Sequence, residues 1–169
     1  YWNDFLRMAR GAAFTDPRLV SDRPLEITEP QLAALVGEAR FYSATYRLFN
    51  IPELEDACED HGQAVIYKGS IEQAATRMEF DKHHSIEVGK VFPVCGNTYR
   101  MLRQTCFASH FQFIGDFDRR YCFFEDCGSA TPFDQNRWIC RDHHQEKPAI
   151  AFEWVCRLGQ LSSTLPNGL

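Results

Sequence analysis

The chain has 169 residues, of which 44% are hydrophobic and 14% aromatic, and its formal net charge is −5. This length and composition suffice for one hydrophobic core of ordinary size. The acidic balance, with basic residues scattered along the chain, argues against a nucleic-acid binder. No apolar run approaches the roughly 20 residues of a membrane span.

The first third of the chain predicts two helices joined by extended segments. The segment "YWNDFLRMARGAAF" has apolar residues along one face and a glycine stop at Gly11, which is typical of an amphipathic helix. The stretch "TDPRLVSDRPLEI" predicts a short strand, a turn at residues 22–24 and a second extended piece. In "TEPQLAALVGEA", Thr28 is the expected N-cap, Pro30 lies in the first turn and Gly37 ends the helix. The apolar stripe expected to be buried on this helix consists of Leu32, Leu35 and Val36.

The middle of the chain predicts an α+β fold, with a small antiparallel sheet and a few helices. "RFYSATYRLF" alternates in side-chain character and is rich in β-forming residues, so it is the clearest strand. "QAVIYKG" predicts a second strand, "TRMEFD" and "HSIEVGK" a hairpin, and "HFQFIGDF" a further strand. "NTYRMLRQT" predicts a helix capped by Asn97. From about Cys122 the pattern becomes irregular.

Cysteine usage indicates free thiols. The seven cysteines are an odd number and are spread from Cys58 to Cys156, which favours the reduced thiols of a cytoplasmic protein over a disulfide framework. Cys58 lies among carboxylates, and anionic neighbours raise the pKa of a thiol. It is therefore either an idle thiol in a solvated loop or a thiol whose role does not need a free thiolate. The four neighbouring carboxylates belong to Glu55, Asp56, Glu59 and Asp60.

Three motifs in a fixed order carry a family resemblance. With "RFYSATYRLF", "CEDHGQAVIYKG" and "PVCGNTYRMLRQTCFASHF", the chain resembles the C-terminal part of the microbial arsenite S-adenosylmethionine methyltransferases, from Tyr1 to about Gly128. In that family a Rossmann-like domain binds S-adenosylmethionine and a following domain binds trivalent arsenic. The resemblance implies that residues 1–27 are the last helix and strands of the methyltransferase domain. Residues 28–121 would then be the arsenic-binding domain, and residues 122–169 an irregular tail containing Cys and His.

The resemblance also implies a reaction and its participants. The chain would hold As(III) through cysteine thiols for methyl transfer from S-adenosyl-L-methionine, in arsenic detoxification. Arsenite, methylated arsenicals and a thiol reductant such as glutathione or thioredoxin would be its partners. The ten glycines never form the G-x-G turn that brings a backbone against such a cofactor. Because the chain also opens inside a helical pattern, we expect a fragment that is inactive alone.

Cys58 and Cys95 are the candidate arsenic ligands. Arsenite is uncharged at neutral pH, and each of its As–OH groups can be exchanged for As–S with release of water, for which soft thiols are suited. Even a protonated Cys58 can condense in this way, and neighbouring carboxylates could carry its proton to the departing hydroxide. Cys95 in "PVCGNT" precedes a Gly-Asn turn, which would expose it. Alternatively, Cys95 is a small apolar residue at the end of a strand.

The chain departs from the family pattern at one position. Family members carry a cysteine shortly before the "RF-S-TYR" strand, where this sequence has Ala39. The other thiol of the family's pair precedes Tyr1. The arsenic site is therefore either completed by Cys58 or impaired.

A zinc module is the competing interpretation of the tail. Four sulfur and nitrogen ligands in two pairs are typical of structural zinc sites, and the tail offers such a set. The ligands in this alternative are Cys122, Cys127, Cys140 and His143.

Two other features are assigned structural roles. His83 and His84 are adjacent, so on a strand they would point to opposite faces, and we expect surface hairpin residues instead of a metal site. Cys106, late in a predicted helix, is expected in the core.

Overall fold

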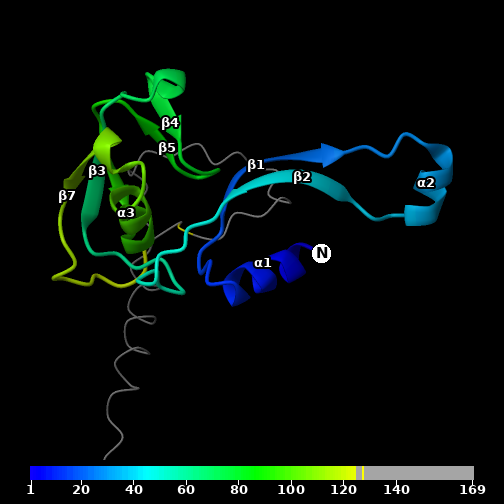
Figure 1. The fold of residues 1–169 in the computed structure, drawn as a ribbon, viewed down its shortest axis with the longest axis horizontal. Helices are drawn as coiled ribbons and strands as arrows, with labels where there is room; N and C mark the ends of the chain where they lie inside the picture. The colour runs from blue at the N-terminus through cyan, green and yellow to red at the C-terminus, as the bar shows by residue number, and fades with distance from the viewer. Residues whose placement is uncertain (125–126, 128–169) are drawn as a thin grey trace, which may run out of the picture. The chain divides into compact units, whose positions relative to one another are not determined.

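A computed structural model of the protein describes residues 1–124 and 127, all of which belong to a compact unit formed by residues 1–136. The elements in chain order are α1 (Trp2–Gly11), β1 (Arg18–Leu25), α2 (Pro30–Val36), β2 (Phe41–Arg47), β3 (Gln63–Tyr67), β4 (Arg77–Glu79), β5 (Ser85–Glu87), β6 (Val91–Val94), α3 (Gly96–Arg103) and β7 (Phe111–Ile114) (Figure 1). All paired strands run antiparallel. The predicted α+β class is therefore confirmed, whereas the Rossmann-like character of the first segment stays a prediction. No helix in the described part of the chain is long and apolar enough to span a membrane.

β1 and β2 form a two-stranded ribbon with α2 at its far end (Figure 1). The turn predicted at residues 22–24 is wrong, because β1 continues through this region and pairs Asp22 with Ala44 and Pro24 with Tyr42. Proline is tolerated here since β2 is the single strand partner of β1 among the described residues, so the missing N–H lies on an open edge. β1 and β2 lie on opposite sides of the domain boundary predicted after residue 27, and that boundary stays a prediction.

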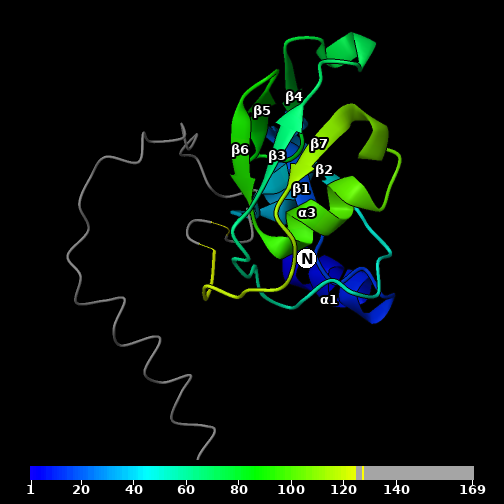
Figure 2. The same ribbon diagram turned by 90° about the vertical axis from the view of Figure 1, so that its left-hand side faces the viewer.

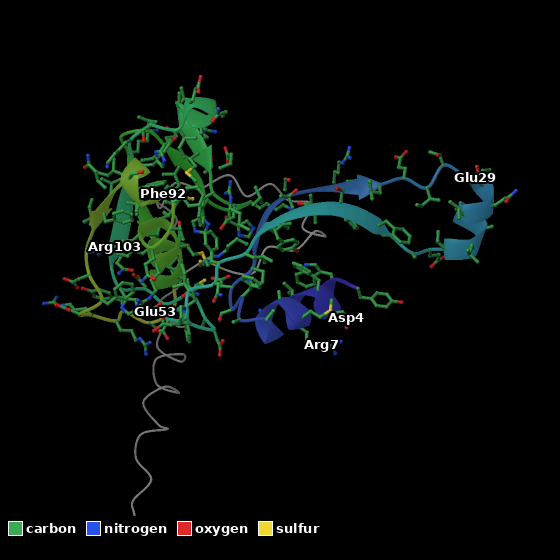
Figure 3. The ribbon with its side chains drawn as sticks, viewed as in Figure 1. Asp4, Arg7, Glu29, Glu53, Phe92 and Arg103 are labelled. Carbon is green, nitrogen blue, oxygen red and sulfur yellow. The ribbon has the colours of Figure 1, made fainter. Side chains whose placement is uncertain are left out.

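The helix α2 is confirmed, but two details predicted for it are wrong. Glu29, not Thr28, is the N-cap, and it makes no side-chain capping hydrogen bond. The apolar stripe is not buried, because Leu32 and Leu35 are 52% and 82% exposed. Glu29 lies at the distal end of the ribbon (Figure 3), where no other described element packs on the apolar face of the helix. Gly37 ends the helix as predicted, with φ at 58°.

The hydrophobic core lies around the three-stranded sheet β6-β3-β7 and the helix α3 (Figure 2). β3 is the central strand, and its Val65 and Tyr67 are fully buried. The hairpin of β4 and β5 adds Phe80 and Ile86 to the same cluster. The sheet therefore supplies a rigid frame for the loops that precede β3 and follow β6.

Two predictions about burial are wrong, one for a histidine expected at the surface and one for a cysteine expected in the core. His84 is buried, because its ring Nδ1 and backbone N–H bond to the Asp81 carboxylate at 2.7 and 2.9 Å in the turn between β4 and β5. Cys106 is exposed, since α3 ends at Arg103 and Cys106 lies in the following loop.

Candidate thiol site

Three cysteine sulfurs converge on one point. The Sγ atoms of Cys58, Cys95 and Cys127 all lie within 4.8 Å of one another. The Cys127 thiol donates to the Cys95 sulfur at 3.4 Å. The structure thus brings together the two residues predicted as arsenic ligands and adds Cys127, which sequence reasoning assigned to zinc.

A long-range backbone pairing explains how Cys127 reaches the other two thiols. The segment 121–124 runs antiparallel beside residues 58–60, with an isolated β-bridge between Glu59 and Phe123. The Phe124 N–H donates to the Cys58 carbonyl oxygen at 2.9 Å. This pairing brings Cys127 next to the loop that carries Cys58.

Cys95 is placed by the start of helix α3. It is the N-cap residue, and its sulfur accepts a hydrogen bond from the Thr98 N–H at 3.4 Å. The prediction that Asn97 caps this helix is wrong. The Asn97 amide instead bonds both backbone groups of Glu55, at 2.9 and 2.8 Å, and donates to Asp16 at 3.0 Å. Because a helix N-terminus favours negative charge, this position stabilises a thiolate at Cys95.

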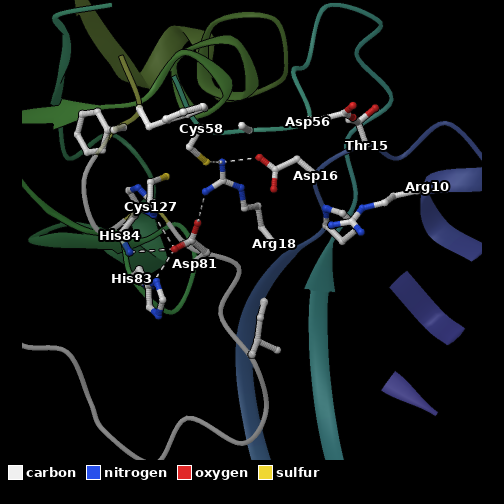
Figure 4. A pocket seen from close by; sticks show the side chains of 15 residues that line it. Arg10, Thr15, Asp16, Arg18, Asp56, Cys58, Asp81, His83, His84 and Cys127 are labelled. Atoms are coloured by element: carbon white, nitrogen blue, oxygen red, sulfur yellow. Dashed lines mark hydrogen bonds and ion pairs between the residues drawn. The ribbon is translucent and has the colours of Figure 1, made fainter. Parts of the chain in front are cut away.

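Arg18 is a buried cation between the sulfurs and two carboxylates (Figure 4). Its Nη2 lies 3.8 Å from the Cys95 sulfur and 3.9 Å from the Cys58 sulfur. The guanidinium also pairs with Asp16 at 2.6 Å and Asp81 at 3.3 Å. Burial opposes its charge, but these anions together hold the pKa of Arg18 well above its usual value.

Asp81 is anchored as a carboxylate on the other side of this guanidinium. Burial acts to raise its pKa, but the hydrogen bond and charge of His84 and the charge of Arg18 outweigh burial and hold the pKa well below its usual range. Asp81 therefore stays ionised near neutral pH and holds the guanidinium from this side.

The hydrogen bonds within the cluster favour ionisation of Cys95 over that of the other two thiols. Hydrogen bonds from Cys127 and Cys58, helped by Arg18, lower the pKa of Cys95 far below its ordinary value despite burial. The bond with Cys127 acts to lower the pKa of Cys58, but the bond with Cys95, burial and the charge of Cys95 raise it to about 12. Hydrogen bonds with Cys58 and Cys95 also raise the pKa of Cys127. The bond with Cys95, burial and the charge of Cys95 therefore keep Cys58 protonated, and the nearby carboxylates are not among the main causes.

The carboxylates around Cys58 are largely engaged elsewhere. Arg120 pairs with Glu55 at 3.0 Å and with Glu59. Asp60 accepts from the Gly62 N–H at 2.7 Å. Asp56 is therefore the remaining one of these four carboxylates that could accept the proton of the Cys58 thiol, and it lines a cavity beside that thiol.

A cavity of about 300 Å³ opens onto the thiols. Cys58 and Cys127 line it, whereas Cys95 is fully buried behind them. Its other lining residues include Asp16, Asp56 and His84 (Figure 4). A small solute can thus reach Cys58 and Cys127 from one side, and the buried Cys95 sulfur lies 3.4 Å from that of Cys127.

The predicted zinc set is only partly within the described residues. Cys127 belongs to the three-thiol cluster, and Cys122 belongs to no group of three or more potential ligands in the part of the chain that the structure describes. Cys140 and His143 lie outside the described residues. The zinc set therefore stays a prediction.

Comparisons with known proteins find similar sequences and a similar structure among arsenite methyltransferases. An arsenite methyltransferase of Aquipseudomonas alcaligenes is 63% identical over 135 residues, which are 80% of this chain and 39% of that protein. One from Rattus norvegicus is 33% identical over 67% of this chain and 30% of that protein. The crystal structure of an arsenic (III) S-adenosylmethionine methyltransferase from Chlamydomonas reinhardtii superposes with a TM-score of 0.70 and 44% identity, covering 73% of this chain and 41% of that one.

The chain thus spans about two fifths of the length of the first of these relatives. The family model described as "Domain of unknown function (DUF8838)" matches residues 54–149, which include Cys58, Cys95 and Cys127. The chain therefore belongs to the DUF8838 family, and its resemblance to the arsenite methyltransferases, predicted from the motifs, is confirmed.

Proposed function

We propose that this chain is the arsenic-binding part of an arsenite methyltransferase, in which Cys58, Cys95 and Cys127 hold As(III) for methylation by S-adenosylmethionine. The observation that carries the proposal is the convergence of three sulfurs within 4.8 Å beside a cavity. The names of the relatives supply the reaction, and the thiol cluster supplies a chemical reason for it. In the cell this activity would serve arsenic detoxification in the cytoplasm.

The exchange of the three arsenic-bound hydroxyl groups for three cysteine sulfurs consumes one proton overall. The Cys95 thiolate attacks arsenic, an As–S bond forms, and hydroxide leaves and takes a proton from solvent. The two protonated thiols then each replace one hydroxyl, and each releases one water. The sum is As(OH)₃ + RS⁻ + 2 RSH + H⁺ → As(SR)₃ + 3 H₂O. The mixed protonation state is suited to this sequence, because the thiolate starts the exchange and the thiols supply protons to the later leaving groups.

The spacing of the sulfurs is compatible with a single bound atom. With bonds of about 2.3 Å, the length typical of metal–thiolate sites, three sulfurs on one three-coordinate atom stand at most about 4 Å apart. Any pair of sulfurs near the 4.8 Å limit would therefore move closer together when arsenic binds. Arg18, freed from the thiolate on arsenic binding, would remain paired with Asp16 and Asp81.

The methyl transfer itself needs little acid–base catalysis from these residues. The lone pair of thiolate-bound arsenic would attack the methyl carbon of the sulfonium, and the electrons of the broken C–S bond would stay on the cofactor's sulfur. Sulfur ligands donate electron density to arsenic and exclude water from it, while the protein aligns the two reactants. A reductant such as glutathione or thioredoxin would keep the three cysteines as free thiols.

Titration with arsenite under reducing conditions tests the proposal. We expect one equivalent to bind, and Cys95→Ser or Cys58→Ser to weaken binding by more than about 100-fold, because even indirect metal-site contacts are worth 10–100-fold. Cys106→Ser is the matched control, since this exposed thiol lies outside the cluster. Equal affinities for Cys95→Ser and Cys106→Ser proteins, both folded by circular dichroism, would contradict the proposal.

Zinc binding is the second candidate function, because Cys127 belongs both to the thiol cluster and to the predicted zinc set. Metal analysis after purification would reveal stoichiometric zinc if the predicted set of Cys122, Cys127, Cys140 and His143 binds it. Cys58→Ser separates the two functions, since it should weaken arsenite binding and leave that zinc in place.

A further inference from the structure

A second group of potential ligands lies on the loop that carries Cys58. One carboxylate oxygen each from Glu55 and Glu59 and one ring nitrogen of His61 lie within 4.8 Å of one another. None of the three clustered thiols belongs to this group. The proposed function uses none of these three side chains.

His61 is held in the orientation of a metal ligand. Its side chain is only 7% exposed. Its Nδ1 lies 2.7 Å from the Arg119 carbonyl oxygen, which can only accept, so Nδ1 carries the hydrogen and donates it. In the neutral ring Nε2 then offers its lone pair. This atom is buried without a hydrogen-bond partner and lies 3.9 Å from a Glu55 oxygen.

Helix α3 supplies the wall against which this ring packs. A Cβ at Gly96 would lie 3.0 Å from Cδ2 of His61, so glycine at this position leaves room for the imidazole. A buried polar atom without a partner costs free energy. The unpaired Nε2 is therefore an independent sign, besides the carboxylates, that a ligand belongs in this group.

Arg120 is a replaceable cation at the same place. It pairs with Glu55 at 3.0 Å and with Glu59, but its side chain is 59% exposed. Exposed ion pairs contribute little, so the guanidinium can move into solvent at low cost. Arg120 pairs with one oxygen of each carboxylate and leaves Glu55 Oε2 and His61 Nε2 without hydrogen-bond partners, whereas a metal ion could bind all three side chains.

We propose that Glu55, Glu59 and His61 form a site for a divalent transition-metal cation such as Zn²⁺, separate from the thiol cluster, and that Arg120 competes with the ion for the two carboxylates. Two carboxylates neutralise the double charge, and imidazole with carboxylate oxygen is a donor set that suits zinc. Three protein ligands leave a fourth position for water.

The ion would brace the loop that carries Cys58. The Glu59 carbonyl accepts from the Gly96 N–H at 2.9 Å, next to Cys95. The backbone of Glu55 is bonded to Asn97 of the same helix. A cation joining Glu55 and Glu59 to His61 therefore fixes the loop on both sides of Cys58 against the start of α3.

Titration with Co²⁺, a spectroscopic substitute for Zn²⁺, tests this site on the full chain. Sulfur ligands give Co²⁺ an intense charge-transfer band, whereas nitrogen and oxygen ligands give only weak d–d bands. We expect a bound equivalent whose d–d bands persist in Cys95→Ser and disappear in His61→Ala. The difference spectrum between wild type and His61→Ala should contain no sulfur band. His110→Ala, which removes an exposed imidazole bonded to Ser70, is the matched control.

Arg120→Ala supplies a second test that does not depend on losing a ligand. Removal of the competing guanidinium should tighten Co²⁺ binding about 2- to 5-fold, the factor that corresponds to an exposed ion pair. The proposal would be overturned if the wild-type chain shows no d–d bands of Co²⁺ bound by nitrogen and oxygen, or if those bands persist in His61→Ala. Unchanged or weaker Co²⁺ binding in Arg120→Ala would also overturn it. The outcome of these Co²⁺ titrations does not change the arsenite affinity expected for Cys95→Ser, so the arsenic proposal and the metal proposal can fail separately.

Discussion

The negative charge on Cys95 is favoured by hydrogen bonds from Cys127 and Cys58 and by one buried cation, Arg18, and the substitution Arg18→Met removes that cation. Arg18 Nη2 lies 3.8 Å from the Cys95 sulfur. At an effective dielectric constant of about 20, unit charges at this distance interact by about 4 kcal/mol. That energy corresponds to about a thousandfold change in the ratio of thiolate to thiol. Methionine keeps an apolar stem in the same space, so the substitution isolates the charge.

The same substitution takes the guanidinium away from Asp81, which is buried, and from Asp16, which is half-buried. Asp16 and Asp81 both pair with Arg18, so unfolding should become easier by about 3–5 kcal/mol, the usual cost of breaking a buried ion pair. Arg18→Lys keeps the charge and loses the forked geometry. Its effects on both the thiolate and the stability should therefore be smaller.

Ultraviolet absorbance of the thiolate, followed against pH, is the assay. We expect the wild-type chain to retain one thiolate at pH 6 and Cys95→Ser to lack it. In Arg18→Met the same absorbance should appear only at higher pH. A folded Arg18→Met protein with the wild-type titration would refute the view that Arg18 stabilises the Cys95 thiolate.

Three further predictions concern the charge, the core and the turns. Below pH 9 the unfolded chain binds one more proton at Cys95 than the folded chain does, so wild-type stability should rise from pH 6 to 8 by up to about 1.4 kcal/mol per pH unit. Urea melts of Cys95→Ser should lack this part of the slope; identical slopes would exclude a thiolate at Cys95. Phe80→Ala, at a fully buried ring, should cost about 3–5 kcal/mol. Val91→Ala at a 60% exposed position should change stability by less than about 0.5 kcal/mol, and similar thermal shifts would contradict the core assignment. Gly69→Ala should lower the melting temperature more than Gly89→Ala. Both have positive φ, but a Cβ at Gly69 would lie 2.8 Å from a backbone oxygen and one at Gly89 would meet nothing within 4 Å.

The elements predicted best are those with a strong local signal. β2 and β3 follow from alternation and β-forming residues, and the hairpin of β4 and β5 follows from two such runs close in sequence. The apolar stripe of α2 shows the limit of this reasoning. Periodicity identifies an apolar face, but it does not say which element covers that face, and no described element covers Leu35.

The thiol site depended on contacts that local patterns do not encode. The pairing of residues 58–60 with 121–124 joins two irregular segments far apart in the chain, so sequence spacing placed Cys127 with zinc ligands. The cap of α3 was missed for a related reason. Asparagine is a strong N-cap former, but Asn97 is used for a tertiary contact with Glu55, which leaves capping to Cys95.

Arsenic K-edge X-ray absorption of the 1:1 arsenite complex tests the central claim most directly, because it counts the atoms bonded to arsenic. Three sulfur neighbours and no oxygen are expected, with one sulfur lost in Cys127→Ser. A spectrum with oxygen neighbours in the wild-type chain, or three sulfurs that persist in Cys127→Ser, would contradict a site built from Cys58, Cys95 and Cys127.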